Sequence, residues 1–332
     1  MTDLPLDPGA RVLATVGDLR AAARLEPLID DLAVTVVCPE VCATVEDWHE
    51  RGLVVWEART ATLEDVAAAD VVVNSSVPEV RARNERASKG EGTGLVTLVG
   101  GGPSDPALLT LAGQAALAEA DVVLADRLGP VAALADLPEH VEVVDVSKIP
   151  YGRSTAQEEI HRLLIEHARA GRRVVRLKGG DSFVFGRGGE EVEACQAAGV
   201  ATRVIPGVTS AVSAPELAGI PVTHRGVSQG FTVVSGHVPP GHPTSTVDWS
   251  ALARSGVTVV VLMGMRNLSR IAEALVDGGL DPATPAAVVA DAARPSQRVV
   301  RATVAAIAEQ AQEAGVGAPA VTVVGAVAAL GA

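Results

Sequence analysis

The sequence contains very few aromatic, lysine and cysteine side chains. Only 2% of its 332 residues are aromatic, and its three lysines are Lys89, Lys148 and Lys178. Its three cysteines are too few for a disulfide framework and lack the paired CxxC spacing of a zinc site, so we expect neither a disulfide scaffold nor a bound metal. The scarcity marks each remaining lysine as a candidate for chemistry that arginine cannot supply.

Long apolar runs and an excess of positive charge are absent as well. No stretch reaches the roughly 18 apolar residues of a membrane span, and the first ten residues carry acids rather than an export signal, so we expect a cytoplasmic protein without a membrane partner. The net charge of −13 argues against a nucleic-acid partner. Residues 148–187 nevertheless hold nine basic and four acidic side chains, a local excess that suits an anionic small molecule.

Short apolar runs alternate with helical patterns, which predicts an α/β architecture with parallel strands. A first set of strands is expected at 11–16, 33–37, 53–56 and 70–74, followed by a polar, glycine-rich linker at 87–94. The second set comprises strands at 95–99, 121–125, 173–177 and 202–205 and helices at 106–118, 155–170 and 189–198. The last third has strands near 232–235, 257–263, 286–290 and 320–324 and helices near 268–277 and 304–314.

Two glycine-rich loops follow strands of the second set. One lies in VGGGPSDPALLT (99–110), and the other in LKGGDSFVFGRGGEE (177–191), which also holds two of the three phenylalanines. Because glycine loses the most chain entropy on ordering, this composition favours a ligand-binding role. Asp126 ends a predicted strand, where ligands bind in a parallel α/β sheet, and Lys148 follows 22 residues later. A structural ion pair is the alternative for either residue.

Five motifs occur in the order and at the spacing typical of one family. They are VGGGPSDPALLT, ADVVLADRL, LKGGDSFVFGRGGEE, IPGVTSA and GIPVTHRG, and the similarity continues through VVLMGM to the end of the chain. This region resembles the uroporphyrinogen-III C-methyltransferases, S-adenosylmethionine-dependent enzymes that begin the siroheme and cobalamin branches. The resemblance implies a tetrapyrrole methylase fold of two α/β lobes, 91–207 and 208–332, with the cofactor between them. It also implies methylation of C2 and C7 of uroporphyrinogen III to give precorrin-2.

The resemblance assigns site residues one by one. The contacts with S-adenosylmethionine fall on Pro103, Gly179, Gly180, Asp181, Val184, Thr209, Ser210, Met263 and Ala292. Departures from the family pattern are Ser104 and Ala292 in place of glycine, Val184 in place of a larger aliphatic residue, and Ser210 in place of alanine. The catalytic acid/base pair falls on Asp126 and Lys148, and the family implies a homodimer.

The implied chemistry suits these residues. A pyrrole carbon attacks the sulfonium methyl in line, so orientation and a dry cleft matter more than a nucleophilic side chain. Asp126 would accept the proton that the intermediate sheds, and Lys148 would donate or relay a proton, which arginine does not do because it stays protonated. The candidates to pair with the substrate's eight carboxylates are Arg127, Arg153, Arg176, Arg187 and Arg225.

Residues 1–90 resemble, more loosely, the dehydrogenase module of siroheme synthase, through PLDPGARVLATVG, VTVVCPEV, ADVVVNSS and RNERA. The glycine fingerprint is missing, since ATVGDLRAAA keeps only Gly17. Without it the backbone does not approach a pyrophosphate closely. The family's strand with the catalytic aspartate, and its dimerisation and chelation segment, have no counterpart. We therefore predict a small, truncated Rossmann-like domain without dehydrogenase or ferrochelatase activity.

Two other functions stay open at this point. One is a bifunctional enzyme with residual NAD-dependent precorrin-2 dehydrogenase activity, which oxidation of precorrin-2 would reveal. The other is a tetrapyrrole- or nucleotide-binding regulator. The presence of Asp126, Lys148 and the GGD sequence at 179–181 argues against the regulator, because a protein that only binds needs no acid/base pair.

Overall fold

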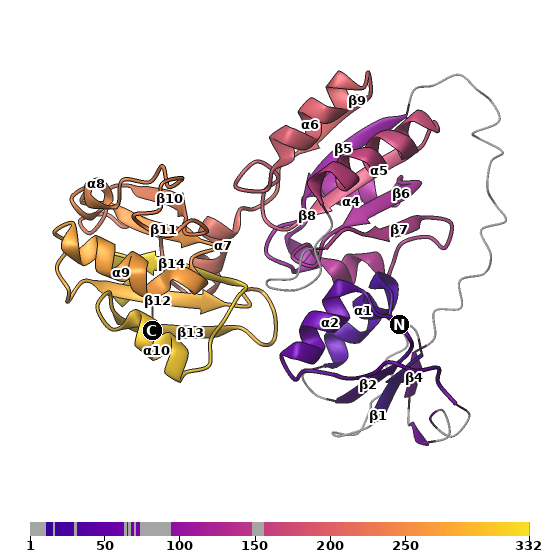
Figure 1. Ribbon diagram of the computed structural model, residues 1–332, viewed down its shortest axis with the longest axis horizontal. Coiled ribbons are helices and arrows are strands. Elements are labelled where there is room, and N and C mark those ends of the chain that lie inside the picture. Colours follow the sequence, from indigo (N-terminus) through magenta and orange to yellow (C-terminus); the bar gives the residue numbers. More distant parts are fainter. Residues whose placement is uncertain are drawn as a thin grey trace. The chain divides into compact units, whose positions relative to one another are not determined.

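The computed structural model describes residues 11–15, 17–29, 32–62, 94–147 and 156–331, together with Asp65, Ala68, Ala69 and the backbone of 71–73. Apart from Gly94, the predicted linker at 87–94 lies outside these residues. The chain divides into two compact units, residues 1–207 and 208–332 (Figure 1). Within the described ranges, no helix is both long and apolar enough to cross a membrane.

The first sheet of unit 1 has four parallel strands. They are β1 (Arg11–Ala14), β2 (Ala33–Val37), β3 (Val55–Glu57) and β4 (Val71–Val73). Their spatial order, β3-β2-β1-β4, is the order of the first four strands of a Rossmann sheet. Two helices follow β1 and β2, namely α1 (Leu19–Leu25), with a 3-10 turn at Glu26–Leu28, and α2 (Ala43–Glu50). We call residues 11–73 the N-terminal module.

The second sheet of unit 1 has five parallel strands in the order β7-β6-β8-β5-β9. These are β5 (Leu95–Gly100), β6 (Val122–Ala125), β7 (Glu142–Asp145), β8 (Arg173–Lys178) and β9 (Ala201–Ile205). The helices are α4 (Leu111–Ala118), α5 (Gln157–Arg169) and α6 (Gly188–Ala197), and 3-10 turns lie at Pro106–Leu108 and Val131–Leu134. Because the strands are parallel, their carboxyl ends share one edge of the sheet.

The helix predicted over 106–118 is wrong in its first part. The chain makes a short 3-10 turn and returns to extended backbone at Leu109, and α4 begins only after Thr110. The Thr110 hydroxyl accepts a hydrogen bond from the Gly113 amide at 3.1 Å, which caps the helix and fixes its start.

The N-terminal module shares its hydrophobic core with the second sheet. Leu25 and Trp48 of the module belong to the same buried cluster as Leu117 and Leu134 of the following segment. Helices α1 and α2 lie between the two sheets of unit 1 (Figure 1). The Arg20 guanidinium donates to main-chain carbonyls on the far side of this contact, including that of Pro138 at 3.1 Å. The described residues of the N-terminal module therefore pack onto the segments of the second sheet.

Unit 2 is built on a mixed sheet in the order β10-β11-β14-β12-β13. Its strands are β10 (Phe231–Ser235), β11 (Thr258–Leu262), β12 (Pro285–Ala290), β13 (Arg298–Thr303) and β14 (Ala320–Val324). Strand β10 is parallel to β11, whereas β14 is antiparallel to both β11 and β12. Strands β10, β11 and β12 thus end at the same edge. The helices are α7 (Ser210–Leu217), α8 (Trp249–Ala253), α9 (Leu268–Asp277) and α10 (Ile307–Glu313), with 3-10 turns at Met265–Asn267 and Ala326–Ala329.

Candidate functional site

The predicted site residues of unit 1 gather at the carboxyl edge of its second sheet. Pro103 follows β5, Asp126 follows β6, and the loop Gly179–Val184 follows β8. In the sheet, β6 and β5 flank β8, so these three segments are neighbours. Lys148 follows β7, the strand beside β6, but it lies outside the described residues.

The glycines of this edge let three loops pack backbone against backbone. Gly102 and Gly180 exchange two main-chain hydrogen bonds, at 3.1 and 2.8 Å. Gly100 and Gly207 are so close that a Cβ on either would come within 2.4 Å of the other's backbone, and a Cβ on Gly179 would lie 2.4 Å from the Leu128 carbonyl oxygen. These contacts are between parts of the protein, so the glycines are needed for loop packing whether or not a ligand also approaches them.

Asp181 joins two of these loops. Its Oδ2 accepts a hydrogen bond from the Gly207 amide at 3.1 Å, and its Oδ1 accepts one from the Phe183 amide at 2.9 Å. Phe183 and Phe185 are 58% and 44% exposed, whereas phenylalanine is usually buried. They are two of the three phenylalanines in the chain. The loop after β8 is thus rigidly held at its start and presents apolar surface beyond it.

Asp126 has a fixed but accessible carboxylate. Its Oδ1 accepts from the Leu128 amide at 3.1 Å, and its Oδ2 accepts from Nη2 of Arg176 at 3.1 Å. The side chain keeps 21% of its surface exposed, whereas that of Arg176 keeps 4%. A carboxylate held in one orientation and open on one side is suited to accept a proton from a bound molecule.

Behind Asp126 lies a buried network of charges. Glu191, which is fully buried, accepts from Nε of Arg176 at 3.1 Å, from Nζ of Lys178 at 3.0 Å and from the side-chain amide of Gln157 at 3.2 Å. Burial lowers the pKa of the Lys178 ammonium, the nearby Arg176 guanidinium lowers it further, and the Glu191 carboxylate opposes both. Two carboxylates and two cations balance in this network, so it is neutral overall.

Sequence reasoning marked the segment that contains Lys178 and Glu191 but gave neither residue a role. The available signal was the spacing of a cation at the end of β8 and an acid in the first turn of α6, 13 residues later. A charged side chain that a strand buries needs a buried partner, and Glu191 supplies it for Lys178.

The five candidate arginines fall into different environments. Arg176 and Arg127 are buried and engaged by protein carboxylates, Arg127 by Asp47 at 3.2 Å. This placement favours a supporting role over a substrate contact for both. Arg187 is exposed and pairs with Glu190 at 2.7 Å, Arg225 is exposed on unit 2, and Arg153 lies outside the described residues.

The predicted cofactor contacts of unit 2 lie at the start of α7 and at the ends of β11 and β12. The Thr209 hydroxyl accepts from the Ala211 amide at 3.3 Å and so caps α7, which begins at Ser210. Met263 directly follows β11 and is 47% exposed, and Ala292 is half-buried two residues after β12.

Among the described non-glycine residues, left-handed backbone occurs only in loops that carry predicted cofactor contacts. Within the described ranges, the non-glycine residues with positive φ are Ser104, Phe185, Arg187, Met263, Asp291 and Ala293. All of them lie just after β5, β8, β11 or β12. Each such conformation costs on the order of 1 kcal/mol or more and tends to persist at functional sites. The strain therefore marks four of the five segments that carry predicted cofactor contacts, the exception being the start of α7.

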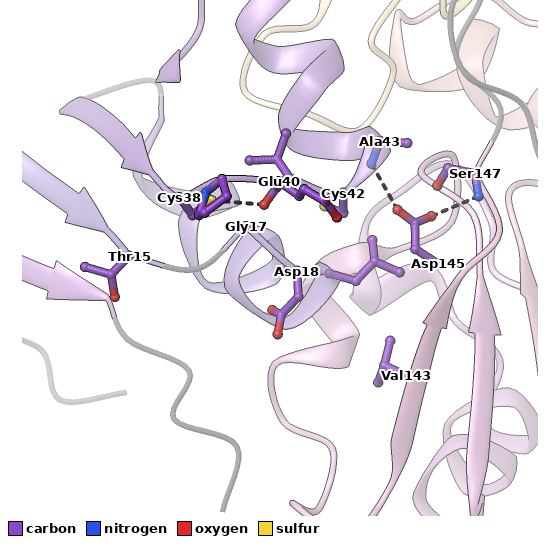
Figure 2. Close-up of a pocket in the computed structure, with 13 residues that line it drawn as sticks. Thr15, Gly17, Asp18, Cys38, Glu40, Cys42, Ala43, Val143, Asp145 and Ser147 are labelled. Carbon is purple, nitrogen blue, oxygen red and sulfur yellow. Dashed lines mark hydrogen bonds between the residues drawn. The ribbon is translucent and has the colours of Figure 1, made fainter. Parts of the chain in front are cut away.

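A cavity of about 730 Å³ lies apart from Asp126, between the N-terminal module and β7 (Figure 2). Among the described residues, its lining includes Asp18, Glu40 and Asp145 and no basic side chain. Asp18 accepts from the Ala21 amide at 2.7 Å and occupies the amino terminus of α1, where a Rossmann fold would hold a pyrophosphate. This arrangement disfavours a dinucleotide here.

Several known proteins are similar to this chain in sequence and structure. The family model for Tetrapyrrole (Corrin/Porphyrin) Methylases matches residues 95–308. An S-adenosyl-L-methionine-dependent uroporphyrinogen III methyltransferase from Methanosarcina barkeri is 46% identical over 232 residues, 70% of this chain and 91% of the relative. A Thermus thermophilus uroporphyrin-III C-methyl transferase, solved with S-adenyl homocysteine, is 46% identical with a TM-score of 0.59, and the match covers 70% of this chain and 98% of that one.

Siroheme synthases are also similar, but this chain spans only about half of their length. The Xylella fastidiosa enzyme is 43% identical over 72% of this chain and 50% of its own length. The match to the Chromobacterium violaceum enzyme, 41% identical, extends over 273 residues, more than residues 95–332 alone contain. Similarity to siroheme synthase thus reaches into the first 94 residues.

Proposed function

Because this chain belongs to the tetrapyrrole methylase family, we propose that it transfers two methyl groups from S-adenosylmethionine to C2 and C7 of uroporphyrinogen III, giving precorrin-2 for siroheme or cobalamin synthesis. The observation that carries this proposal is the 46% identity to a uroporphyrinogen III methyltransferase over 91% of that protein's length. The strained loops and the fixed carboxylate of Asp126 support it independently.

The proposed cofactor is S-adenosylmethionine, as in the related methyltransferases. When bound, the cofactor supplies an electrophilic methyl group. We propose that Pro103, Gly179, Gly180, Asp181 and Val184 contact it, and that Thr209, Ser210, Met263 and Ala292 are further contacts. Exposed apolar side chains such as Met263 suit an adenosyl group, and the rigid, backbone-lined loops suit its polar edges.

Asp126 is the proposed proton acceptor. Its Oδ atoms are oriented by Arg176 and the Leu128 amide, and the remaining lone pairs on the exposed side would take the proton that leaves the methylated ring. Lys148 is the proposed donor or relay, because an ammonium releases a proton far more readily than a guanidinium. Arg153, Arg187 and Arg225 stay candidates for the substrate carboxylates.

We further propose that the chain lacks dehydrogenase activity, and that it acts as a homodimer in the cytoplasm. A carboxylate rather than free amides stands at the amino terminus of α1, and one glycine remains of the dinucleotide fingerprint. A bifunctional methyltransferase with residual dehydrogenase activity is the alternative, supported by the similarity to siroheme synthase in the first 94 residues. Light scattering of the purified protein tests the dimer.

One assay tests the main proposal. Uroporphyrinogen III and S-adenosylmethionine are incubated anaerobically with the protein, and the products are identified by mass spectrometry. A doubly methylated product supports the proposed function, and its absence with active control enzyme present contradicts it. Adding NAD to the same mixture separates the two alternatives, since only a dehydrogenase converts the product further.

A further inference from the structure

Helix α2 of the N-terminal module contacts the chain beside both proposed catalytic positions. Asp47 on α2 pairs with Arg127, the residue that follows Asp126, at 3.2 Å. At the start of the same helix, the Ala43 amide donates a hydrogen bond to Oδ2 of Asp145 at 3.0 Å. Asp145 ends β7, three residues before Lys148 (Figure 2).

The Asp47–Arg127 pair is almost completely removed from water. The side chains are 10% and 4% exposed, respectively. Displacing either partner of a buried ion pair weakens the compensation of the other's charge, and Asp47 has Arg51, at 3.4 Å, as a second cationic partner. Three contacts hold the turn 126–128. Arg176 of β8 and the Leu128 amide both donate to the Asp126 carboxylate, and Arg127 pairs with Asp47 of α2.

The contact at Asp145 is reciprocal. The residue before α2 is Cys42, whose side chain makes no capping hydrogen bond, so the helix has no cap of its own. Asp145 supplies one from β7 and is itself attracted to the positive end of the helix. Its other oxygen accepts from the Ser147 amide at 2.8 Å, which orients the chain just before Lys148.

We propose that α2 is a positioning element of the methyltransferase, with Asp47 and Asp145 as its positioning residues. The helix contacts the turn after β6 and the end of β7, and so holds Asp126 in place relative to the end of β7. This inference rests on the proposed function and extends it, since it gives the N-terminal module a part in methyl transfer that does not depend on NAD binding. Misplacing a reacting group by about 1 Å can cost on the order of a hundredfold in rate.

The experiment compares Asp47→Asn with Glu50→Gln, which makes the same chemical change at an exposed position of the same helix. We expect the kcat of D47N to fall about 10- to 100-fold, while the KM for S-adenosylmethionine and the affinity for S-adenosylhomocysteine stay within about twofold. E50Q should match the unmodified protein, and Asp47→Glu should recover part of the lost kcat. An unchanged kcat in D47N, or a parallel loss of cofactor affinity, overturns the inference.

The double variant D47N/R127Q guards against loss of folding, because it removes both charges together. A kcat no lower than that of either single variant supports coupling between Asp47 and Arg127, and additive losses contradict it. Hydrogen exchange gives a readout without turnover: amides of 124–130 and 143–147 should exchange faster in D47N than in E50Q. Equal exchange in the two variants overturns the inference, whatever the methylation assay shows. Failure of the unmodified protein to methylate uroporphyrinogen III would instead count against the proposed function alone.

Discussion

Nη2 of Arg176, on β8, donates a hydrogen bond to Oδ2 of Asp126, which directly follows the neighbouring strand β6, at 3.1 Å. The same guanidinium donates from Nε to Glu191 and from Nη1 to the Leu177 carbonyl oxygen, so its hydrogen-bonding groups are directed at the protein. Arg176 therefore orients the Asp126 carboxylate. This role explains why an arginine stands in a buried strand better than a contact with the substrate does.

Replacing Asp126 by asparagine should lower kcat by about 10²- to 10⁴-fold, because an amide accepts no proton and a positioned base contributes about that much. The affinity for S-adenosylhomocysteine, measured by calorimetry, should change less than about twofold, since asparagine keeps an oxygen that accepts from the Leu128 amide. Asp136→Asn is the control, because it neutralises an exposed aspartate on the same sheet connection. Turnover equal to that of the control would remove Asp126 from the mechanism.

Replacing Glu191 by glutamine should destabilise the protein by about 3–5 kcal/mol, because Arg176 and Lys178 would lose their shared buried anion. Glu190→Gln, one residue earlier and 50% exposed, should cost less than about 1 kcal/mol. Urea unfolding of both variants at neutral pH measures the difference. Similar midpoints for the two variants would mean that the network contributes little to stability.

Much of the fold follows from hydrophobic patterning. The predicted helix over 268–277 and the predicted strand at 320–324 have the observed bounds of α9 and β14, because each carries a strong apolar period. Strands β7 and β13 were missed. Strand β13 lies at the edge of its sheet and mixes arginine with valine, and β7 carries acids at both ends. Neither sequence therefore has the apolar run that predicts a buried strand.

The site was predicted less completely than the fold. A strand end and its glycine loop are local features, and the sequence therefore indicates Asp126 and the segment 177–191. The partners of a buried charge come from distant segments: Arg127 meets Asp47, 80 residues earlier, and Glu191 meets both Arg176 and Lys178. Such pairings depend on how helices pack onto the sheet, and no periodicity along the chain encodes them.

Alkaline pH should destabilise the protein in part through Cys195. Its side chain is fully buried, and burial, together with the negative charge of Glu191, raises the thiol's pKa to about 11. In the unfolded chain the thiol loses its proton near pH 9, whereas the folded protein keeps the proton to higher pH. The stability that this group contributes is therefore complete below pH 9 and is lost as the pH rises from 9 to 11.

Between pH 9 and 11, the free energy of unfolding of Cys195→Ala should fall by about 2–3 kcal/mol less than that of the unmodified protein. This follows from roughly 1.4 kcal/mol for each unit of pKa difference. The check is urea unfolding of both proteins at several pH values from 7 to 11. Lys178 titrates in both proteins, so its contribution cancels in the comparison. Parallel profiles would show that Cys195 does not titrate differently in the folded and unfolded states.

NAD should leave the thermal stability of the protein unchanged. A ligand present at 100 times its Kd stabilises a folded protein by about 2.7 kcal/mol, which raises the melting temperature by several degrees. Asp18 occupies the amino terminus of α1, and the cavity beside it is lined by acids, so a pyrophosphate would meet carboxylates instead of free amides. Thermal melts with millimolar NAD should therefore match melts without it, while S-adenosylhomocysteine, as the positive control, should raise the midpoint. A rise with NAD comparable to that control would restore the bifunctional alternative, because the N-terminal module would then hold its dinucleotide despite the missing glycines.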